Sequence, residues 1–261
     1  MYFIDFHTHV YPDAIAPKAA DSIRRFYRLG DDYMDGRVQT LLKYGTEAGV
    51  EKFVILPVSL RPTNTRHINE FIIEQVAKEP RFYGYGTVHA GMLDLCEEVE
   101  FIMANGLRGL KMHTDCQVFP IDDPRLFPVY EMAQDKLPIL FHMGDRRYDY
   151  SHPKRLRKVL ELFPKLQVIA AHFGGYTMHE IAKEELKGKD CFFDVSSSLM
   201  FMEEGVAEAY INHYGAERFV YGSDFPMWNP VVEMERFQRL KLSDSQKEQI
   251  AHITAEQILK L

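Results

Sequence analysis

The sequence contains few cysteines, and their spacing does not suggest a disulfide framework. Cys96, Cys116 and Cys191 are the three in 261 residues, and no two of them form a Cys-x-x-Cys pair. Because an odd, scattered set of thiols is typical of proteins that stay reduced, we expect free, mostly buried cysteines and a cytoplasmic location.

The sequence also lacks an excess of positive charge and any long hydrophobic run. Its 31 lysines and arginines are outnumbered by 38 acidic residues, so the net charge is −7. That balance argues against broad attraction to nucleic acid, and no apolar run approaches the ~20 residues that span a bilayer. A strand pattern begins almost at the first residue, so we expect no cleaved signal. We expect a single domain over residues 1–261, whereas the oligomeric state leaves no signature.

Apolar segments alternate with helical patterns along the chain. Near-continuous apolar runs, typical of strands buried on both faces, occupy 2–7, 53–58, 82–88, 107–112, 138–142, 167–171, 191–195 and 219–223. Helical patterns occupy 13–29, 37–49, 64–78, 93–104, 124–136, 153–163, 177–188 and 243–261. The spacing of the later strands, about 25–30 residues, is that of a βα unit. We therefore predict a (β/α)8 TIM barrel with an extended first βα loop, which includes the charged stretch 30–36, and a C-terminal helix.

Six of the eleven histidines fall at the C-terminal ends of these predicted strands. They are His7, His9, His89, His113, His142 and His172, and the last strand ends just before Asp224. In a parallel barrel these ends converge on one face, where the active sites of barrel enzymes lie. Unrelated histidines would be spread over helices and loops, so the clustering predicts a functional site.

His7 and His9 are one residue apart on a predicted strand, so their side chains point to the same side. Composition alone often produces such a pair. The pair becomes evidence for a site only together with the polar residues at the ends of the other strands. Together with His142 and Asp224 it supplies three imidazole nitrogens and a carboxylate, enough to hold one zinc-like ion and leave a position for water. Such an ion lowers the pKa of bound water to about 7. We expect Asp224 to accept the proton of that water, and His172 to hydrogen-bond the water or the substrate oxygen.

Other polar and aromatic residues have competing explanations. Lys111 either faces the metal or the substrate, or forms a structural ion pair. Arg146 and Arg147 either bind a substrate carboxylate or form a solvated charge run. Trp228 either lines the substrate site or packs under its loop. The remaining histidines fit structural roles better: His67, His89, His113, His152, His179, His213 and His252.

Six segments share their motifs and order with a known family. They are IDFHTHV at 4–10, GLRGLKMH at 106–113, PILFHMGD at 138–145, VIAAHFGG at 168–175, FFDVSS at 192–197 and RFVYGSDFPM at 218–227. With these motifs the chain resembles the amidohydrolase superfamily, specifically its amidohydrolase 2, or amidohydrolase-related, branch. The phosphoesterases of the polymerase-and-histidinol-phosphatase type begin with a similar strand but typically end in Asp-x-His, whereas Phe225 and Pro226 follow Asp224 here.

The resemblance implies a TIM barrel with one metal ion held by His7, His9, His142 and Asp224. It also implies an active-site role for His172. Many superfamily members hold a second metal through a carboxylated lysine on the fourth strand, near the place of Lys111. Members of this branch are generally mononuclear, so we expect Lys111 to contact substrate instead.

The resemblance implies a metal-dependent enzyme and leaves the reaction open. We expect hydrolysis of a small, carboxylate-bearing ester, lactone or amide, with Asp224 and His172 as catalytic residues. The alternatives are metal-dependent decarboxylation or hydration of a small carboxylic acid, and a non-catalytic ligand-binding barrel. Zinc is the expected ion, although manganese, iron or cobalt also suits these ligands. The expected partner is a small-molecule substrate, with neither nucleic acid nor membrane.

Overall fold

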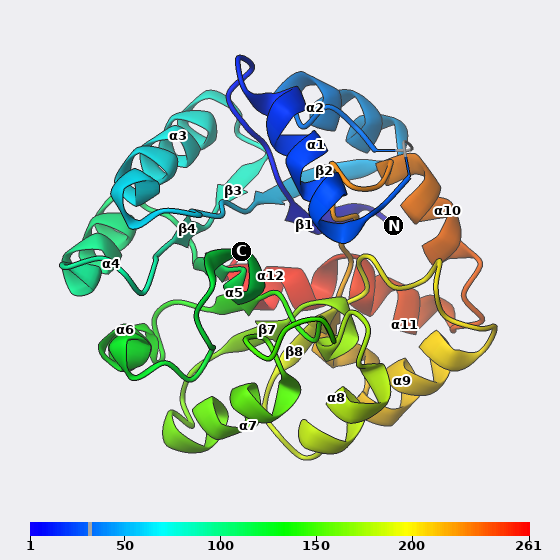
Figure 1. The fold of residues 1–261 in the computed structure, drawn as a ribbon. Helices are drawn as coiled ribbons and strands as arrows, with labels where there is room; N and C mark the ends of the chain where they lie inside the picture. Colours follow the sequence, from blue (N-terminus) through cyan, green and yellow to red (C-terminus); the bar gives the residue numbers. More distant parts are fainter. Residues whose placement is uncertain (31–32) are drawn as a thin grey trace. The chain divides into compact units, whose positions relative to one another are not determined.

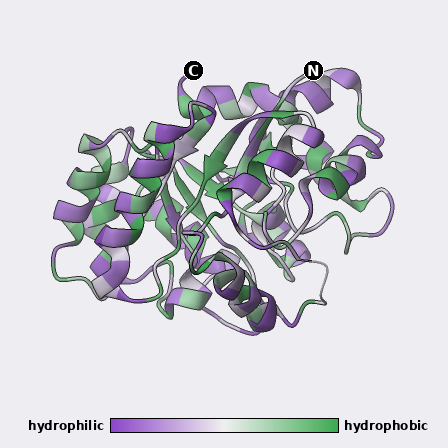
Figure 2. Cartoon of the chain, turned by 90° about the horizontal axis from the view of Figure 1, so that it is seen from above, coloured by the Kyte–Doolittle hydropathy of each residue, from purple (hydrophilic) through white to green (hydrophobic). Residues whose placement is uncertain are grey.

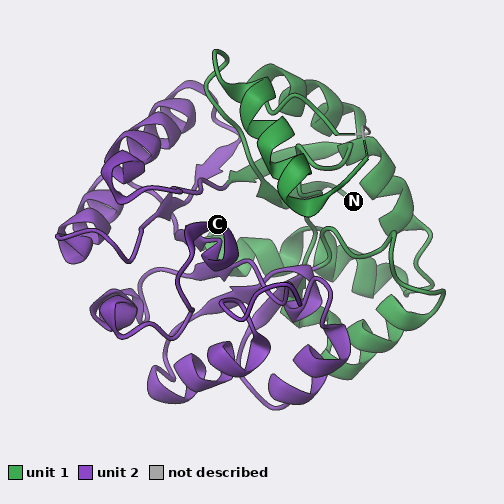
Figure 3. Ribbon diagram, in the orientation of Figure 1, with its two compact units in different colours: residues 1–55, 195–261 green, residues 56–194 purple. Residues whose placement is uncertain are grey.

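The computed structural model describes residues 1–30 and 33–261, which divide into two compact units. Unit 1 comprises residues 1–55 and 195–261, and unit 2 comprises residues 56–194 (Figure 3). Asp31 and Asp32, in the charged stretch of the first loop, lie outside the described residues. That residues 1–261 form a single domain stays a prediction.

Unit 1 is built on β1 (Phe3–Thr8), all six residues of which are buried. β1 pairs in parallel with β2 (Val50–Ile55). The segment that continues from β9 (Phe219–Val220) also runs beside β1, since the Phe6 N–H donates to the Tyr221 carbonyl at 2.8 Å. The C-terminal end of β1 is therefore flanked by the turn that follows β9.

Unit 1 also contains helices. They are α1 (Ala16–Tyr27), α2 (Val38–Glu47), α9 (Val206–Tyr214), α10 (Pro230–Gln238), α11 (Asp244–Glu248) and α12 (Thr254–Leu259). Of these, α2 contacts β2 and α12 contacts β9. The long connection from β1 to β2 contains α1 and α2, and α2 contacts both β2 and α10. A π-helical turn, Gln249–Ile253, joins α11 to α12 and contacts β1 and β9. The extended first βα loop and the helical C-terminus agree with the prediction.

Unit 2 contains a parallel sheet in the order β4-β5-β6-β7-β8. Its strands are β3 (Phe82–Gly84), β4 (Gly86–Thr87), β5 (Leu110–Met112), β6 (Ile139–Phe141), β7 (Val168–Ala170) and β8 (Phe192–Asp194). Its helices are α3 (Thr65–Lys78), α4 (Leu95–Ala104), α5 (Thr114–Gln117), α6 (Phe127–Ala133), α7 (Pro153–Leu162) and α8 (His179–Glu185) (Figure 1). In Figure 2 the strands are coloured mainly as hydrophobic, whereas the helices also contain hydrophilic stretches. This pattern is expected for a sheet covered by amphipathic helices.

Each predicted strand has a counterpart, with shifted boundaries. The run at 82–88 is divided at Tyr85 into β3 and β4, and β2 begins at Val50, earlier than predicted.

The starts of two helical segments differ in their capping. Asn64, which precedes α3, makes no side-chain cap hydrogen bond with a described residue. Asp123 does accept a hydrogen bond from the backbone N–H of Arg125, at the start of a 3₁₀ turn. None of the described helices is long and apolar enough to cross a membrane.

Candidate metal centre

Three potential ligand atoms converge in unit 1, from His7, His9 and Asp224. The Nε2 atoms of His7 and His9 lie 3.2 Å apart. Asp224 Oδ1 lies 3.5 Å from His7 Nε2 and 3.6 Å from His9 Nε2. Tetrahedral ligands held about 2.1 Å from a zinc-like ion are about 3.4 Å apart from one another. The three distances therefore fit one small divalent cation, and we call this group the candidate metal centre.

Backbone hydrogen bonds bring the turn after β9 against the end of β1. The Asp224 N–H donates to the His7 carbonyl at 2.8 Å, and the His9 N–H donates to the Phe225 carbonyl at 2.7 Å. Thr8, between the two histidines, points away from them, and its hydroxyl donates to a β2 carbonyl at 2.8 Å. Asp224 has a φ of +57°, in the left-handed region that aspartate tolerates better than most residues. The carboxylate is thus aimed at the two imidazoles by its own backbone.

Further polar groups contact the ring and the backbone of His7 and fix its orientation. Ser196 Oγ lies 3.1 Å from His7 Nδ1, an interaction that leaves Nε2 for the candidate metal centre. Asp5 is fully buried and accepts hydrogen bonds from the N–H groups of Ser223, at 2.9 Å, and His7, at 3.2 Å. The sequence interpretation missed Ser196 and Asp5. A signal for Asp5 was available, since it precedes His7 by two residues on one strand and so shares its side.

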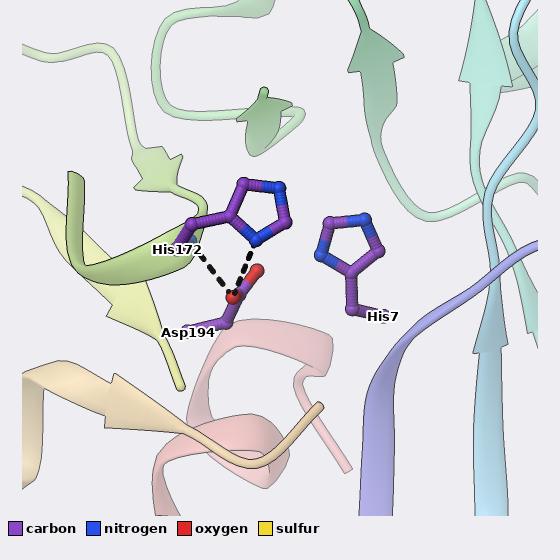
Figure 4. A group of neighbouring side chains, drawn as sticks. All are labelled: His7, His172 and Asp194. Carbon is purple, nitrogen blue, oxygen red and sulfur yellow. Dashed lines mark hydrogen bonds and ion pairs between the residues drawn. The ribbon is translucent and has the colours of Figure 1, made fainter. Parts of the chain in front are cut away.

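Unit 2 brings together His142, His172 and Asp194, all buried. His142 Nδ1 lies 3.0 Å from His172 Nε2. The His172 N–H donates to Asp194 Oδ1 at 3.0 Å, and the ring Nδ1 lies 3.9 Å from the same oxygen (Figure 4). Asp194, at the end of β8, thus holds both the backbone and the ring of His172. The sequence interpretation did not identify it.

His172 occupies a strained turn. It has a φ of +59°, and Phe173, the next residue, has a φ of +54°. Non-glycine residues in the left-handed region cost roughly 1–3 kcal/mol each and persist only where the surroundings fix them. The hydrogen bond to Asp194 supplies part of that fixation. Such strain is typical of residues whose orientation matters for function.

Unit 2 contains its own group of potential ligand atoms, which come from His113, Asp115 and His142. The rings of His113 and His142 stack at 3.9 Å with an angle of 8°. Asp115 Oδ2 lies 3.8 Å from His142 Nε2 and accepts a hydrogen bond from Ser151 Oγ at 2.5 Å. Burial raises the pKa of Asp115 to about 7, against the opposing effect of the Ser151 hydrogen bond. The sequence interpretation missed Asp115 and assigned His113 a structural role.

The predicted substrate-binding residues have partners within the protein. Lys111, on β5, is fully buried. Arg146 donates to a backbone carbonyl at 2.7 Å, and Arg147 pairs with Asp145 at 2.5 Å. The indole N–H of Trp228 donates to a serine hydroxyl at 2.7 Å. Contact of these residues with substrate stays a prediction, as does a four-ligand set that includes His142.

Comparison with known proteins identifies the family to which the chain belongs. Residues 4–261 match the family model described as Amidohydrolase. An uncharacterized Tim-barrel protein from Bordetella bronchiseptica is 22% identical, with 100% of this chain and 99% of that chain covered and a TM-score of 0.83. The predicted TIM-barrel fold is confirmed.

Two decarboxylases of solved structure share the fold. The 5-carboxyvanillate decarboxylase from Sphingomonas paucimobilis is 16% identical over 100% of this chain and 99% of that chain, with a TM-score of 0.75. The dihydroxybenzoic acid decarboxylase from Polaromonas sp. JS666, solved with bound manganese and the inhibitor 2-nitroresorcinol, is 17% identical over 100% of this chain and 97% of that chain, with a TM-score of 0.76.

Proposed function

We propose that this chain, which belongs to the amidohydrolase family, is a metal-dependent decarboxylase of a small aromatic carboxylic acid. The observation that carries the proposal is the convergence of His7 Nε2, His9 Nε2 and Asp224 Oδ1, 3.2 to 3.6 Å apart. The names of two structurally similar proteins, both decarboxylases of aromatic acids, support decarboxylation over the hydrolysis that the motifs alone favoured.

The proposed cofactor is one divalent ion, with His142 as the fourth ligand. The assignment of His142 rests on the family resemblance. Imidazole and carboxylate donors suit both zinc, expected from the sequence, and manganese, which one similar structure contains. When bound, the ion supplies positive charge that holds and polarises the oxygens of an acidic substrate.

The net reaction replaces a carboxylate with a hydrogen atom. The bond between the ring carbon and the carboxylate carbon breaks, carbon dioxide leaves, and the ring carbon that keeps the electron pair takes up a proton. We propose His172 as the residue that holds this proton. Its backbone N–H and its Nδ1 both face Asp194, so the ring orientation is fixed, and its Nε2, which lies 3.0 Å from His142 Nδ1, is the nitrogen we propose for proton exchange.

Substrate recognition is proposed for four residues from the sequence interpretation. Arg146 or Arg147 would pair with a carboxylate, since a guanidinium binds one bidentately. Lys111 would offer a cation to a substrate oxygen. Trp228 would offer only its ring face, because its indole N–H is already donated within the protein.

Hydrolysis of a small ester, lactone or amide is the second candidate, because the family model that matches residues 4–261 is described as Amidohydrolase. In that reaction Asp224 would accept the proton of the attacking water, and His172 would hydrogen-bond the substrate oxygen. The same ligand set serves both reactions, so products must distinguish them.

Product analysis tests the proposal. Protein loaded with Mn²⁺ or Zn²⁺ is incubated with hydroxylated benzoic acids and, separately, with lactones, and both carbon dioxide release and ring opening are followed. We expect carbon dioxide from an aromatic acid, and none from chelated protein or the Asp224→Ala variant. Ring opening of lactones without carbon dioxide release would establish the hydrolytic candidate instead. Metal-loaded protein that releases neither product would favour the non-catalytic barrel.

A further inference from the structure

We propose that Trp228 and Ser197 form a hydrogen-bond relay that determines which oxygen of Asp224 faces the candidate metal centre. Trp228 Nε1 donates to Ser197 Oγ at 2.7 Å, and Ser197 Oγ donates to Asp224 Oδ2. The other carboxylate oxygen, Oδ1, is the one that lies near the Nε2 atoms of His7 and His9. The inference rests on the proposed metal centre and assigns its orientation to two residues outside the ligand set.

The chemistry of the three groups fixes the direction of the relay. An indole N–H is a donor only, so the Ser197 oxygen must accept from Trp228. A hydroxyl has a single proton, which is then left for Asp224. A charge-assisted hydrogen bond to one carboxylate oxygen restricts rotation of the carboxylate and leaves the lone pairs of the other oxygen for a cation.

The backbone holds both ends of the serine–aspartate hydrogen bond in unusual conformations. Ser197 has a φ of +49° and Asp224 a φ of +57°. Ser197 is only 3% exposed, so its hydroxyl is shielded from competing water. The segments that carry the two residues are adjacent, since the Val195 N–H donates to the Val220 carbonyl at 3.2 Å. A left-handed backbone at both positions indicates that the surrounding structure fixes this pairing.

Trp228 makes the relay observable. It is the single tryptophan of the chain and lies two residues before Pro230, the first residue of α10. Its ring packs edge-on against Phe201, with 6.0 Å between the ring centroids. Because the indole N–H reaches Asp224 through one hydroxyl, binding of a cation at Asp224 changes the electronic surroundings of that N–H. Ser197 and Trp228 are thus positioning residues, and the indole N–H resonance of Trp228 reports on cation binding at Asp224.

Metal affinity tests the relay. We expect Ser197→Ala to weaken Mn²⁺ binding, measured by isothermal titration calorimetry, by about 10- to 100-fold, as is usual when a group that orients a ligand is lost. Trp228→Phe, which keeps a ring but no donor, should weaken binding in the same direction by less. Ser198→Ala is the matched control: Ser198 is also buried, and its hydroxyl donates to the Ser196 backbone carbonyl and not to a proposed ligand, so its loss should leave the affinity at the wild-type value.

The indole resonance gives a second readout that does not depend on activity. The ¹H–¹⁵N spectrum should contain one indole cross-peak, which shifts when Zn²⁺ is added to the wild type or to Ser198→Ala. In Ser197→Ala we expect that metal-dependent shift to be lost. Ser197→Gly, which suits a positive φ and also lacks the hydroxyl, replaces the alanine variant if thermal unfolding shows that the latter does not fold.

The outcomes separate the relay from the metal centre. Equal Mn²⁺ affinities for wild type and Ser197→Ala, with the Zn²⁺-dependent indole shift retained, would overturn the relay and leave the metal centre standing. A wild-type protein that binds neither ion would overturn the proposed function, and the relay with it. Weaker binding in Ser197→Ala together with loss of the indole shift supports both.

Discussion

At the end of β1, the two-residue alternation of a strand does most of the positioning. His7 and His9 share one side of the chain with Asp5, which holds backbone N–H groups on both β1 and the turn after β9. His172 is positioned differently: the Asp194 carboxylate accepts from its backbone N–H and faces its ring, and His142 Nδ1 lies 3.0 Å from its Nε2. These two modes of support predict different mutant behaviour.

Asp194→Ala should lower kcat without loss of metal. The substitution removes the acceptor that holds His172, and we expect a fall in kcat of about 10- to 100-fold, typical of a misplaced catalytic group. Asp194→Asn, which keeps an oxygen acceptor for the backbone N–H, should lose less. Kinetics and metal content are measured on the same samples. A parallel loss of metal and activity would show that Asp194 supports the metal rather than His172.

His179, on α8, should make the protein less stable in mild acid. Burial, with a smaller effect of His172, lowers the pKa of His179 to about 4. Because the unfolded chain binds this proton near pH 6.5 and the folded chain only near pH 4, stability is complete above pH 6.5 and falls as the pH drops from 6.5 to 4. The expected loss is about 3 kcal/mol, from about 1.4 kcal/mol per pH unit.

Urea denaturation of wild type and His179→Gln at pH 7 and pH 4 measures this contribution. Glutamine does not titrate, so the variant should lose about 3 kcal/mol less than wild type over that interval. Identical pH dependences would show that His179 does not contribute.

Among the elements, the turns after β6 and β7 are in direct contact. A Cβ on Gly144, which has a φ of +70°, would lie 2.4 Å from the Cα of Gly175. Gly188 has the same φ of +70° but no atom within 4 Å of its Cβ position among the described residues. Alanine substitutions at Gly144 and Gly188 therefore separate the free-energy cost of a left-handed backbone from the cost of a steric clash.

Gly188→Ala should destabilise the protein by about 1 kcal/mol, the usual cost of the left-handed conformation. Gly144→Ala should cost a further 1–3 kcal/mol or so, because neighbouring backbone must move. Chemical denaturation of both variants gives the difference. Equal destabilisation would mean that the two turns move apart freely.

Strands were the elements best predicted from the sequence, because burial on both faces leaves continuous apolar runs. Boundaries were less accurate: Tyr85 interrupts the run at 82–88, a feature that depends on local packing rather than composition. Helices α9 and α10 were missed, although Asn229 and Pro230 form a recognisable helix start for α10.

The candidate site was predicted only in part. His7, His9 and Asp224 could be identified from strand ends and family motifs. Their supporting groups, among them Ser196 and Ser197, lie on the loop after β8, and nothing in a single sequence states which loop atom meets which ligand. Such pairings depend on tertiary structure.

For the molecule as a whole, removal of metal should lower stability. A ligand that binds only the folded state stabilises it by about 2.7 kcal/mol at a free concentration 100 times Kd. We therefore expect Tm to rise when Mn²⁺ or Zn²⁺ is added to chelated wild-type protein, and not when it is added to Asp224→Ala. The same rise in both proteins would place the bound ion elsewhere.

Metal content tests the central claim most directly. Wild-type protein reconstituted with Mn²⁺ or Zn²⁺, freed of excess ion and analysed by inductively coupled plasma mass spectrometry should contain one ion per chain, and Asp224→Ala close to none. A wild-type content near zero, or near two ions per chain, would contradict a mononuclear centre at His7, His9 and Asp224.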